Sequence, residues 1–448
     1  MSPYPWHNKI KKGTLTIAVW AGLLSWAITF YPEVLVTLTS ALEPKLKPKP
    51  VRNFDPNVRV LDDTSGAISQ IVMNIPGEYH DQVLPAVRSF VPQLPSGIQL
   101  IFACSNETGV RSIAEHLDSI ESQALDTADI VLTNLRLTPW ARDRRIARYG
   151  PKGREHFSLI PPTKDWYDTD RRSELKLPNL LNDLNLAPET ISLPFILDGG
   201  NLVTDSHFAF IGGNNIESNE NVIPNLRNLK RMLQLYLGVP PVHIFARKQQ
   251  VPWHHLDMYV TPLPGRRVLV ASPSLAEKLL REAHEQNPIA GEKFLRLSFS
   301  PERTRLFDDV AKQFQKLKYT VIRTPAIPHY LDQWMITYNN VLMDFRGEQS
   351  NVFLPSYGIT SLDNFARALY QDLGFNVHTI DLSSLYREGG SIRCFANITR
   401  RTPAPKQSKS SPELSNGDIT IHRPGMWINE RLRSRANTRP NTIQEPLN

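Results

Sequence analysis

Alternation between short apolar runs and amphipathic stretches is the feature that most limits how this chain can fold. Runs such as "AISQIVMNIP" (67–76) and "GIQLIFAC" (97–104) have the apolar and β-branched content of buried strands. Residues 79–94 and 110–122 carry apolar side chains at a spacing of three and four, which predicts helices. Alternation of this kind over about 66–400 predicts an α/β fold.

The second half of the chain repeats this layout. Residues 225–238 ("NLRNLKRMLQLYLG") have a clear amphipathic pattern that ends at Gly238, and Pro240 and Pro241 follow as stop signals. Strand-like and helical stretches continue to alternate after it, but their sequences share no period that identifies a repeat. The units therefore resemble each other in layout and not in sequence.

The composition is that of a globular protein. Hydrophobic residues make up 41% of the 448 and charged residues 21%, enough for a sizeable core. Much of the basic excess, a formal net charge of +7, lies near the termini at 44–52 and 400–439, which favours a solvated tail and no nucleic-acid partner. Two cysteines, Cys104 and Cys394, exclude a disulfide framework, although one bridge between them stays open.

An uncharged segment at residues 13–32 predicts attachment to a membrane. Its length matches the ~20 residues that a helix needs to cross a bilayer. Lys9, Lys11 and Lys12 precede it, so the N-terminus should stay in the cytoplasm and the rest should be exported. A signal peptide cleaved near 40–41 is the alternative, and a buried core helix is a third. We expect a membrane-anchored protein with its main domain outside the cytoplasm, or a secreted or periplasmic protein after cleavage.

The predicted organisation has four segments. Residues 1–43 hold the membrane anchor or signal segment, and 44–64 form a linker that its Pro-Lys alternation makes stiff and charged. A single α/β domain spans 65–402. The tail at 403–448 is polar and rich in Pro, Ser, Asn and Arg, which predicts disorder.

Four polar clusters interrupt the α/β pattern at or near strand ends. They are "TPWARDRRI" (138–146), "ILDGGNLVTD" (196–205), "WHHLDMYVTPL" (253–263) and "YREGGSIRCFANI" (386–398). In the third cluster His255 and Asp257 are two residues apart, so in a strand they would face the same side. In the fourth, a Gly-Gly pair allows the close backbone approach that would bring a strand with Cys394 to the site.

One cysteine, one histidine and several aspartates together indicate nucleophilic chemistry on a guanidino group. A cysteine thiolate needs a histidine for proton transfer, and the histidine needs a carboxylate to set its tautomer. Additional carboxylates have no role in acyl transfer, but they match the planar fork of donors on a guanidinium. The sequence therefore predicts attack by Cys394 on a guanidino carbon, with His255 and the aspartates of the first three clusters around it.

Each piece alone has a simpler interpretation. Asp-Gly-Gly is usually a turn, and Arg142-Asp143 could be a surface ion pair. Cys394 could be a core residue, as the apolar "LIFAC" predicts for Cys104. Trp140 could be core as well, or it could stack on a guanidinium face. The adjacent histidines of the third cluster could hold a metal, but no further His or Cys cluster stands at ligand spacing, so we expect no metal site.

The four clusters, in this order, resemble the signature segments of the agmatine deiminase and bacterial (Porphyromonas-type) peptidylarginine deiminase family. The matching segments are "WARD", "DGGNLVTD", "HHLDMYV" and "GGSIRC", and the resemblance covers roughly 65–400. It implies a pentein fold, in which five ββαβ-like units surround a pseudo-fivefold axis and the active site lies in a central channel. It also implies a reaction that uses no metal and no cofactor.

The resemblance also implies a role for each matching residue. Cys394 would attack the guanidinium carbon, ammonia would leave, and water would hydrolyse the thiouronium intermediate. His255 would transfer protons and be oriented by Asp198, which stands where the family usually has Glu. Asp143 and Asp257 would bind the guanidinium nitrogens. The remaining substrate residues would be Trp140, stacked on the guanidinium face, and Asn340, which falls in "TYNN" where some members place a substrate-side Asn.

Three cations depart from the family pattern. Arg393 stands where agmatine deiminases have His, and Arg144-Arg145 replaces the usual small-residue and proline pattern after "RD". Such cations would repel a cationic substrate unless they face away or pair with a substrate carboxylate. Free or peptidyl arginine carries a carboxylate or a carbonyl and agmatine does not, so the departures favour arginine-like substrates.

Three functional hypotheses follow. The first is a deiminase that releases ammonia and a ureido product from an arginine-like, peptidyl-arginine or agmatine substrate. The second is an amidinotransferase, which would use the same cysteine but pass the amidino group to an amine. The third is a catalytically silent, membrane-tethered pentein that serves as a binding module. The complete set of site residues argues against the third, because a silent scaffold has no need of them.

Overall fold

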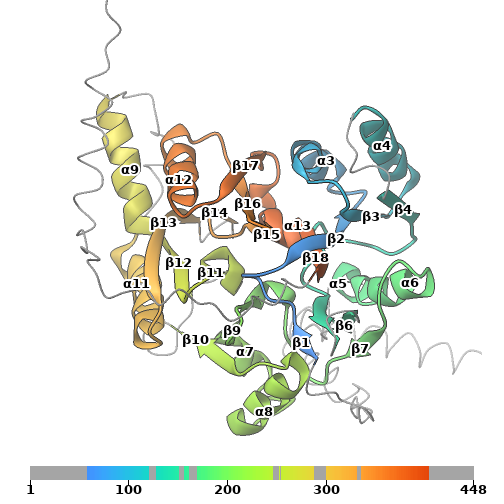
Figure 1. The fold of residues 1–448 in the computed structure, drawn as a ribbon, viewed down its shortest axis with the longest axis horizontal. Coiled ribbons are helices and arrows are strands. Elements are labelled where there is room, and N and C mark those ends of the chain that lie inside the picture. Colours follow the sequence, from blue (N-terminus) through green and yellow to red (C-terminus); the bar gives the residue numbers. More distant parts are fainter. Residues whose placement is uncertain are drawn as a thin grey trace, which may run out of the picture. The chain divides into compact units, whose positions relative to one another are not determined.

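Five small mixed sheets form the part of the chain that the computed structural model describes, residues 58–120, 128–150, 156–160, 169–245, 252, 254–286, 299–329 and 334–402 (Figure 1). The chain divides after Ala404 into two units, and the described residues all lie in the first. The expected membrane segment at 13–32 and the tail at 403–448 lie outside these residues. Within the described ranges, no helix has both the length and the apolar character that crossing a bilayer requires.

One order of elements recurs in the five described sheets: an antiparallel pair of strands, a helical crossover, and a strand parallel to the second of the pair. In the third unit, β8 (Leu202–Thr204) and β9 (Ala209–Gly212) are antiparallel, and β10 (Pro241–Ile244) is parallel to β9. The crossover carries α7 (Asn214–Ser218) and α8 (Leu226–Leu237). This ββαβ unit is the repeat that shows no sequence period, because it repeats backbone topology and not side chains.

Three further units follow the same order. The second contains β5 (Ile146–Tyr149), β6 (His156–Ile160), α5 (Thr169–Glu174), α6 (Leu177–Asp183) and β7 (Thr190–Ser192). The fourth contains β11 (Val260–Leu263), β12 (Arg267–Ser272), α9 (Pro273–Gln286), α11 (Pro301–Lys316) and β13 (Thr320–His329), with β14 (Trp334–Thr337) added beside β13. The fifth contains β15 (Leu342–Arg346), β16 (Gln349–Ser356), α12 (Thr360–Asp372) and β17 (Asn376–Asp381). Figure 1 shows α8, α11 and α12 on the outer side of their strands.

The first unit is completed by the last described strand. β18 (Ala396–Thr402) pairs antiparallel with β2 (Ala67–Ile75), and α3 (His80–Phe90) with the 3-10 turn η1 (Val91–Gln93) leads to β3 (Gln99–Cys104), parallel to β2. This sheet is extended by α4 (Glu107–Asp118) and β4 (Ala128–Leu132). The result is a pentein domain of five ββαβ units, which confirms the predicted α/β fold class.

Residues 58–64 pack onto this domain, although the sequence analysis placed them in the linker at 44–64. β1 (Arg59–Val60) pairs antiparallel with β5. Leu61 is buried, and its N–H donates to the Ala147 carbonyl at 3.0 Å. A strand of two residues is too short for a period-two pattern, so the sequence offers no sign of it.

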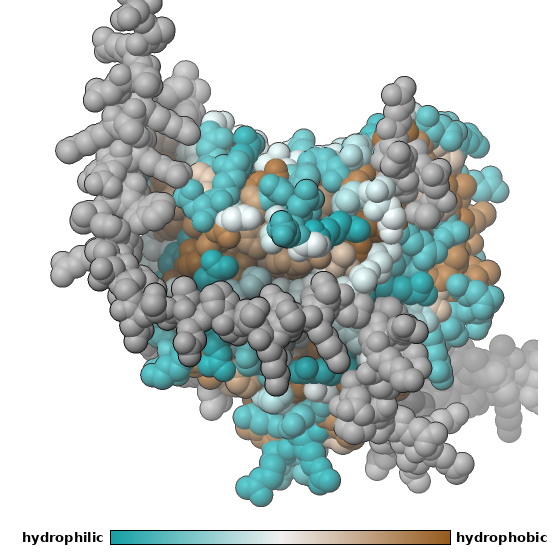
Figure 2. Space-filling view, in the orientation of Figure 1, coloured by the Kyte–Doolittle hydropathy of each residue, from teal (hydrophilic) through white to brown (hydrophobic). Residues whose placement is uncertain are grey.

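Helix α8 ends at the residue that the sequence predicts. The Asn225 side chain accepts hydrogen bonds from the N–H groups of Arg227 (2.9 Å) and Asn228 (3.2 Å), which caps the first turn. Gly238 has a φ of +70°, the left-handed conformation in which glycine commonly terminates a helix. Leu233 lies on the buried face, whereas Figure 2 shows the outer surface over α8 as hydrophilic.

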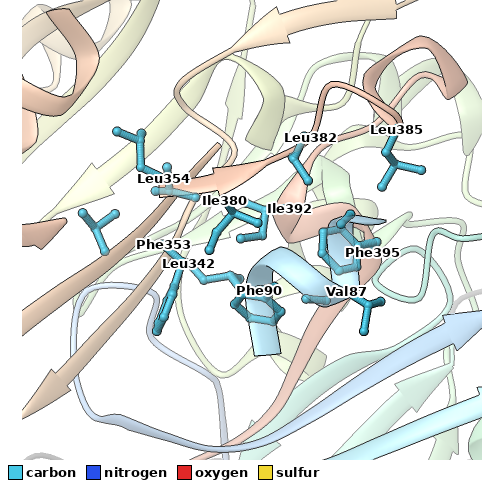
Figure 3. Close-up of a cluster of buried hydrophobic side chains, with 14 of the residues drawn as sticks. Val87, Phe90, Leu342, Phe353, Leu354, Ile380, Leu382, Leu385, Ile392 and Phe395 are labelled. Atoms are coloured by element: carbon cyan, nitrogen blue, oxygen red, sulfur yellow. The ribbon is translucent and has the colours of Figure 1, made fainter. Parts of the chain in front are cut away.

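One core cluster anchors the segment that follows Cys394 (Figure 3). The Phe90 ring of α3 makes T-shaped contacts with Phe353 of β16, at 5.4 Å between centroids, and with Phe395, at 5.9 Å. Aromatic edge contacts of this kind add about 0.5–1.5 kcal/mol to the burial of the rings. Because Phe395 directly follows Cys394, this packing holds the cysteine's backbone in place.

A matched pair of substitutions tests this core. Leu354→Ala removes a side chain that is 1% exposed, so it should lower the free energy of unfolding by about 2–5 kcal/mol. Leu235→Ala makes the same change on α8, where the side chain is 43% exposed, and should cost less than about 1 kcal/mol. Denaturant unfolding of the two variants measures the difference, and equal losses would contradict the assigned core.

Candidate active site

Cys394 lies on α13 (Ile392–Phe395), a single helical turn between the glycine pair and β18. The expected strand at this position is wrong, because the Cys394 N–H closes a helical turn onto the carbonyl three residues earlier, at 3.0 Å. Gly389 has a φ of +90°, and Gly390 lies so close to the Trp140 indole that a Cβ would clash with the ring. The close approach predicted for the Gly-Gly pair is therefore confirmed.

The Cys394 thiol is enclosed by polar and apolar partners. Its side chain is 5% exposed, and Sγ lies 3.7 Å from Asn340 Oδ1 and 3.9 Å from Met258 Sδ. The same Asn340 oxygen accepts a hydrogen bond from the Arg393 N–H at 2.8 Å. That bond fixes the amide oxygen beside the thiol, although Asn340 lies in a different unit of the fold.

Both cysteines have raised pKa values, which favour the protonated thiol. Burial raises the pKa of Cys394 well above its usual value, and the carboxylates of Asp257 and Asp143 raise this pKa further. Burial also raises the pKa of Cys104, at the end of β3, to about 12, as expected of a core cysteine. Both thiols are free, so the bridge that the sequence left open does not form.

His255 lies between two carboxylates, one at each ring nitrogen. Nδ1 is 3.5 Å from Asp143 Oδ1, and Nε2 is 3.7 Å from Asp198 Oδ2. Gly200 lies against the imidazole, where a Cβ would meet the ring. Burial alone would lower the pKa of His255, but Asp143 and Asp198 outweigh it and raise this pKa to about 9. The ring is therefore an imidazolium at neutral pH, able to donate a proton.

His255 and Asp257 do not lie on a strand, contrary to the sequence expectation. His255 precedes the 3-10 turn η5 (Leu256–Met258), and Asp257 lies within it. The Leu256 N–H donates to Asn201 Oδ1 at 3.2 Å. This hydrogen bond joins η5 to η3 (Gly199–Asn201). With about three residues per turn, positions two apart point in different directions. The histidine thus faces carboxylates, while the aspartate faces arginines and the thiol.

Asp257 is a buried carboxylate that lacks hydrogen bonds. Its side chain is 1% exposed, and neither oxygen accepts a hydrogen bond from any described residue. Oδ2 lies 3.7 Å from Arg142 Nε and 3.5 Å from Arg393 Nε, which are ion-pair distances too long for a good hydrogen bond. Burial raises the pKa of Asp257 to about 6, against the opposing effect of both arginines. At neutral pH this acceptor is mostly ionised.

Two of the three added cations, Arg393 and Arg144, are paired with carboxylates of the protein itself. Arg393 Nη2 donates to Asp63 Oδ2 at 2.7 Å. Arg144 donates through Nη1 to Asp198, and its Nε lies 3.8 Å from Glu174 Oε2. The charges of these two arginines are therefore balanced without a substrate carboxylate. The preference for arginine over agmatine therefore loses the support of these two cations.

The structure brings the predicted site residues into one place. The Arg142 N–H donates to the Cys394 carbonyl at 3.2 Å, which joins the loop of the first polar cluster to the turn that carries Cys394. Among the described residues, no group of three His, Cys, Asp or Glu side chains could hold a metal ion. The gathered residues are Trp140, Asp143, Asp198, His255, Asp257, Asn340 and Cys394.

Two carboxylates of this network, Asp63 and Glu174, were not predicted from the sequence. Asp63 pairs with Arg393, and its only signal is a pair of consecutive acids in "LDDTSG" just before a strand-like run. Glu174, at the end of α5, contacts Arg144 and accepts a hydrogen bond from the Thr138 N–H at 2.6 Å. Nothing in the local sequence distinguishes Glu174 from a surface acid.

Comparison with solved structures shows the same fold in deiminases. The agmatine deiminase of C. jejuni matches with a TM-score of 0.58 and 13% identity, over 78% of this chain and 97% of its own. The agmatine deiminase of Enterococcus faecalis matches with a TM-score of 0.53 and 12% identity, over 79% and 99%. A candidate arginine deiminase from Porphyromonas gingivalis matches with a TM-score of 0.54 and 16% identity, over 76% and 97%. No family model and no curated protein matches the sequence.

The thiol's environment predicts a pH effect. Asp257→Asn removes a negative charge that raises the pKa of Cys394, so this pKa should fall and the thiolate fraction at pH 8 should rise, by about tenfold per unit of pKa. Alkylation of Cys394 by uncharged iodoacetamide, followed by peptide mass spectrometry, measures this fraction. Asp81→Asn removes an exposed carboxylate and is the matched control. An unchanged or slower alkylation of the Asp257 variant would contradict the assigned electrostatics.

Proposed function

We propose that the protein is a deiminase, a C–N hydrolase that attacks the guanidinium carbon of its substrate through Cys394. The observation that carries the proposal is Asp257, an almost fully buried carboxylate without hydrogen bonds beside an enclosed thiol. A buried acceptor of this kind is stabilised by a donor, and a guanidinium offers several N–H donors in one plane. The deiminases that share the pentein fold support the same conclusion.

Binding of the substrate would also activate the thiol. Burial and the carboxylates of Asp257 and Asp143 hold the pKa of Cys394 well above its usual value. A guanidinium brings positive charge to these same carboxylates, which favours the thiolate. The Trp140 indole lies against the glycine pair just before the nucleophile, and from there it would stack on the guanidinium face.

The proposed reaction has two halves. In the first, the Cys394 thiol loses its proton to solvent as the guanidinium binds, and the thiolate adds to the guanidinium carbon. The C–N bond then breaks, and the His255 imidazolium donates a proton to the departing ammonia. In the second, His255 takes a proton from water, the water oxygen attacks the thiouronium carbon, and the C–S bond breaks. The products are ammonia and a ureido compound. Asp143 and Asp198, at 3.5 and 3.7 Å from the two ring nitrogens, would hold the imidazole for both transfers.

The proposed chemistry determines which compounds to test as substrates. Agmatine, arginine and arginyl peptides all present the same guanidinium, and the C. jejuni and E. faecalis relatives are named for agmatine. We expect the purified full-length protein to release ammonia and a ureido product from at least one of them.

Matched cysteine variants test the nucleophile. Cys394→Ala should lower kcat/KM by roughly 10³-fold or more, because it removes the group that forms the covalent intermediate. Cys104→Ala should keep most of the activity, since Cys104 is buried in the core at the end of β3. Ammonia release with the best substrate measures both.

Three other outcomes point to other functions. Equal loss in both variants would indicate that the substitutions act through the buried packing and not through a nucleophile. Transfer of the amidino group to an added amine, without release of ammonia, would identify an amidinotransferase. No turnover of any substrate, together with a Cys394 that does not react with a haloacetamidine, would favour a silent binding module.

A further inference from the structure

Arg393 places a guanidinium of the protein's own beside the carboxylate proposed to bind the substrate. Its Nη2 donates a hydrogen bond to Asp63 Oδ2 at 2.7 Å, while its Nε lies 3.5 Å from Asp257 Oδ2 without a hydrogen bond. All three side chains are buried. The arginine thus lies between two acids and is bonded to only one of them.

We propose that Asp63 is a positioning residue that holds Arg393 away from Asp257 and so keeps the substrate carboxylate open. The inference rests on the proposed function, because it concerns the same carboxylate. The arginine side chain ends in the group that the substrate would present. Without a competing acid, it would close onto Asp257 and occupy the place of the substrate guanidinium.

Asp63 is itself firmly held. Its Oδ2 accepts a hydrogen bond from the Thr204 N–H at 2.9 Å and another from Thr204 Oγ1 at 3.3 Å, and the Asp63 N–H donates to the same hydroxyl at 3.2 Å. These bonds fix the carboxylate to the end of β8. Arg393 is fixed at its backbone, where its N–H donates to Asn340. Both ends of the Asp63–Arg393 pair are therefore set by the fold.

The charges around the pair favour this arrangement. Arg393 lowers the pKa of Asp63 against the effect of burial, and Asp63 in turn raises the pKa of Arg393. Arg142 faces both acids, and its Nε is 3.7 Å from Asp257 Oδ2. Asp257 is therefore balanced at a distance by two cations, close enough to keep it ionised but too far to fill its hydrogen-bonding positions.

Loss of the charge on Asp63 should turn Arg393 into an internal competitor. A tethered guanidinium acts at an effective concentration of roughly millimolar or above, comparable to many substrate concentrations. Asp63→Asn in the full-length protein should therefore raise KM for the best guanidino substrate by about tenfold or more. Its kcat should stay within about threefold of the wild-type value. Asp62→Asn is the matched control, because Asp62 accepts hydrogen bonds from Thr64 and Ser65 and contacts neither arginine.

Removal of the competitor should reverse the effect. In the double variant Asp63→Asn/Arg393→Gln, KM should return to within about threefold of wild type, which a merely structural role of Asp63 would not produce. Arg393→Gln alone should also leave KM within about threefold, since the arginine is already held off Asp257 in the wild type. This variant tests the proposal even if Asp63→Asn fails to fold. All variants are assayed at about pH 8, so that Asp257 stays ionised without the Arg393 cation.

The outcomes separate the two proposals. Turnover by the wild type with an unchanged KM in Asp63→Asn, or an equally raised KM in the double variant, would overturn the role of Asp63 alone. A tenfold lower KM in Arg393→Gln would also overturn it, because the arginine would then compete in the wild type. Absence of turnover by the wild type with every substrate would overturn the proposed function, and this inference with it.

Discussion

The antiparallel pairing of β18 with β2 is the interaction on which the rest of the structure depends. It joins the two ends of the described chain, and closing so long a loop costs entropy that only extensive packing can offset. The buried Arg401 strengthens the closure by donating to the carbonyls of Gly66 and Met343, both at 2.8 Å, which links the first unit to the fifth. Because α13 directly precedes β18, this pairing also sets the position of Cys394.

Alternation of buried charge is the second constraint. Taking an isolated ion out of water costs several kcal/mol, so buried charges persist only where they compensate one another. Here acidic and basic side chains alternate in a series of ion pairs. In order they are Glu174, Arg144, Asp198, His255 and Asp143. Asp257 does not belong to this series, and its nearest cations lie too far away for hydrogen bonds. A bound guanidinium would supply the donors that its oxygens lack.

Elements with several periods of apolar spacing could be predicted from the sequence, whereas single turns could not. Helix α8 and the strands β2 and β3 lie close to their predicted ranges, because each carries a repeated pattern. The turns α13 and η5 were assigned to strands, since three or four residues contain no period. The chemistry of the side chains indicated the cysteine, the histidine, the aspartates and Trp140, whereas Asn340 followed only from the family resemblance. Asp63 was not predicted, because its partner lies 330 residues away.

The sequence by itself determined the kinds of secondary structure and the set of side chains available for chemistry. These depend on spacing and residue type within a few positions, which a linear chain displays directly. Only the tertiary structure decided how those groups are charged and paired. The pKa of His255, near 9, and that of the buried Cys394 thiol, well above its usual value, both come from burial and from carboxylates in other units. Such effects act through space, so they exist only once distant segments have been brought together.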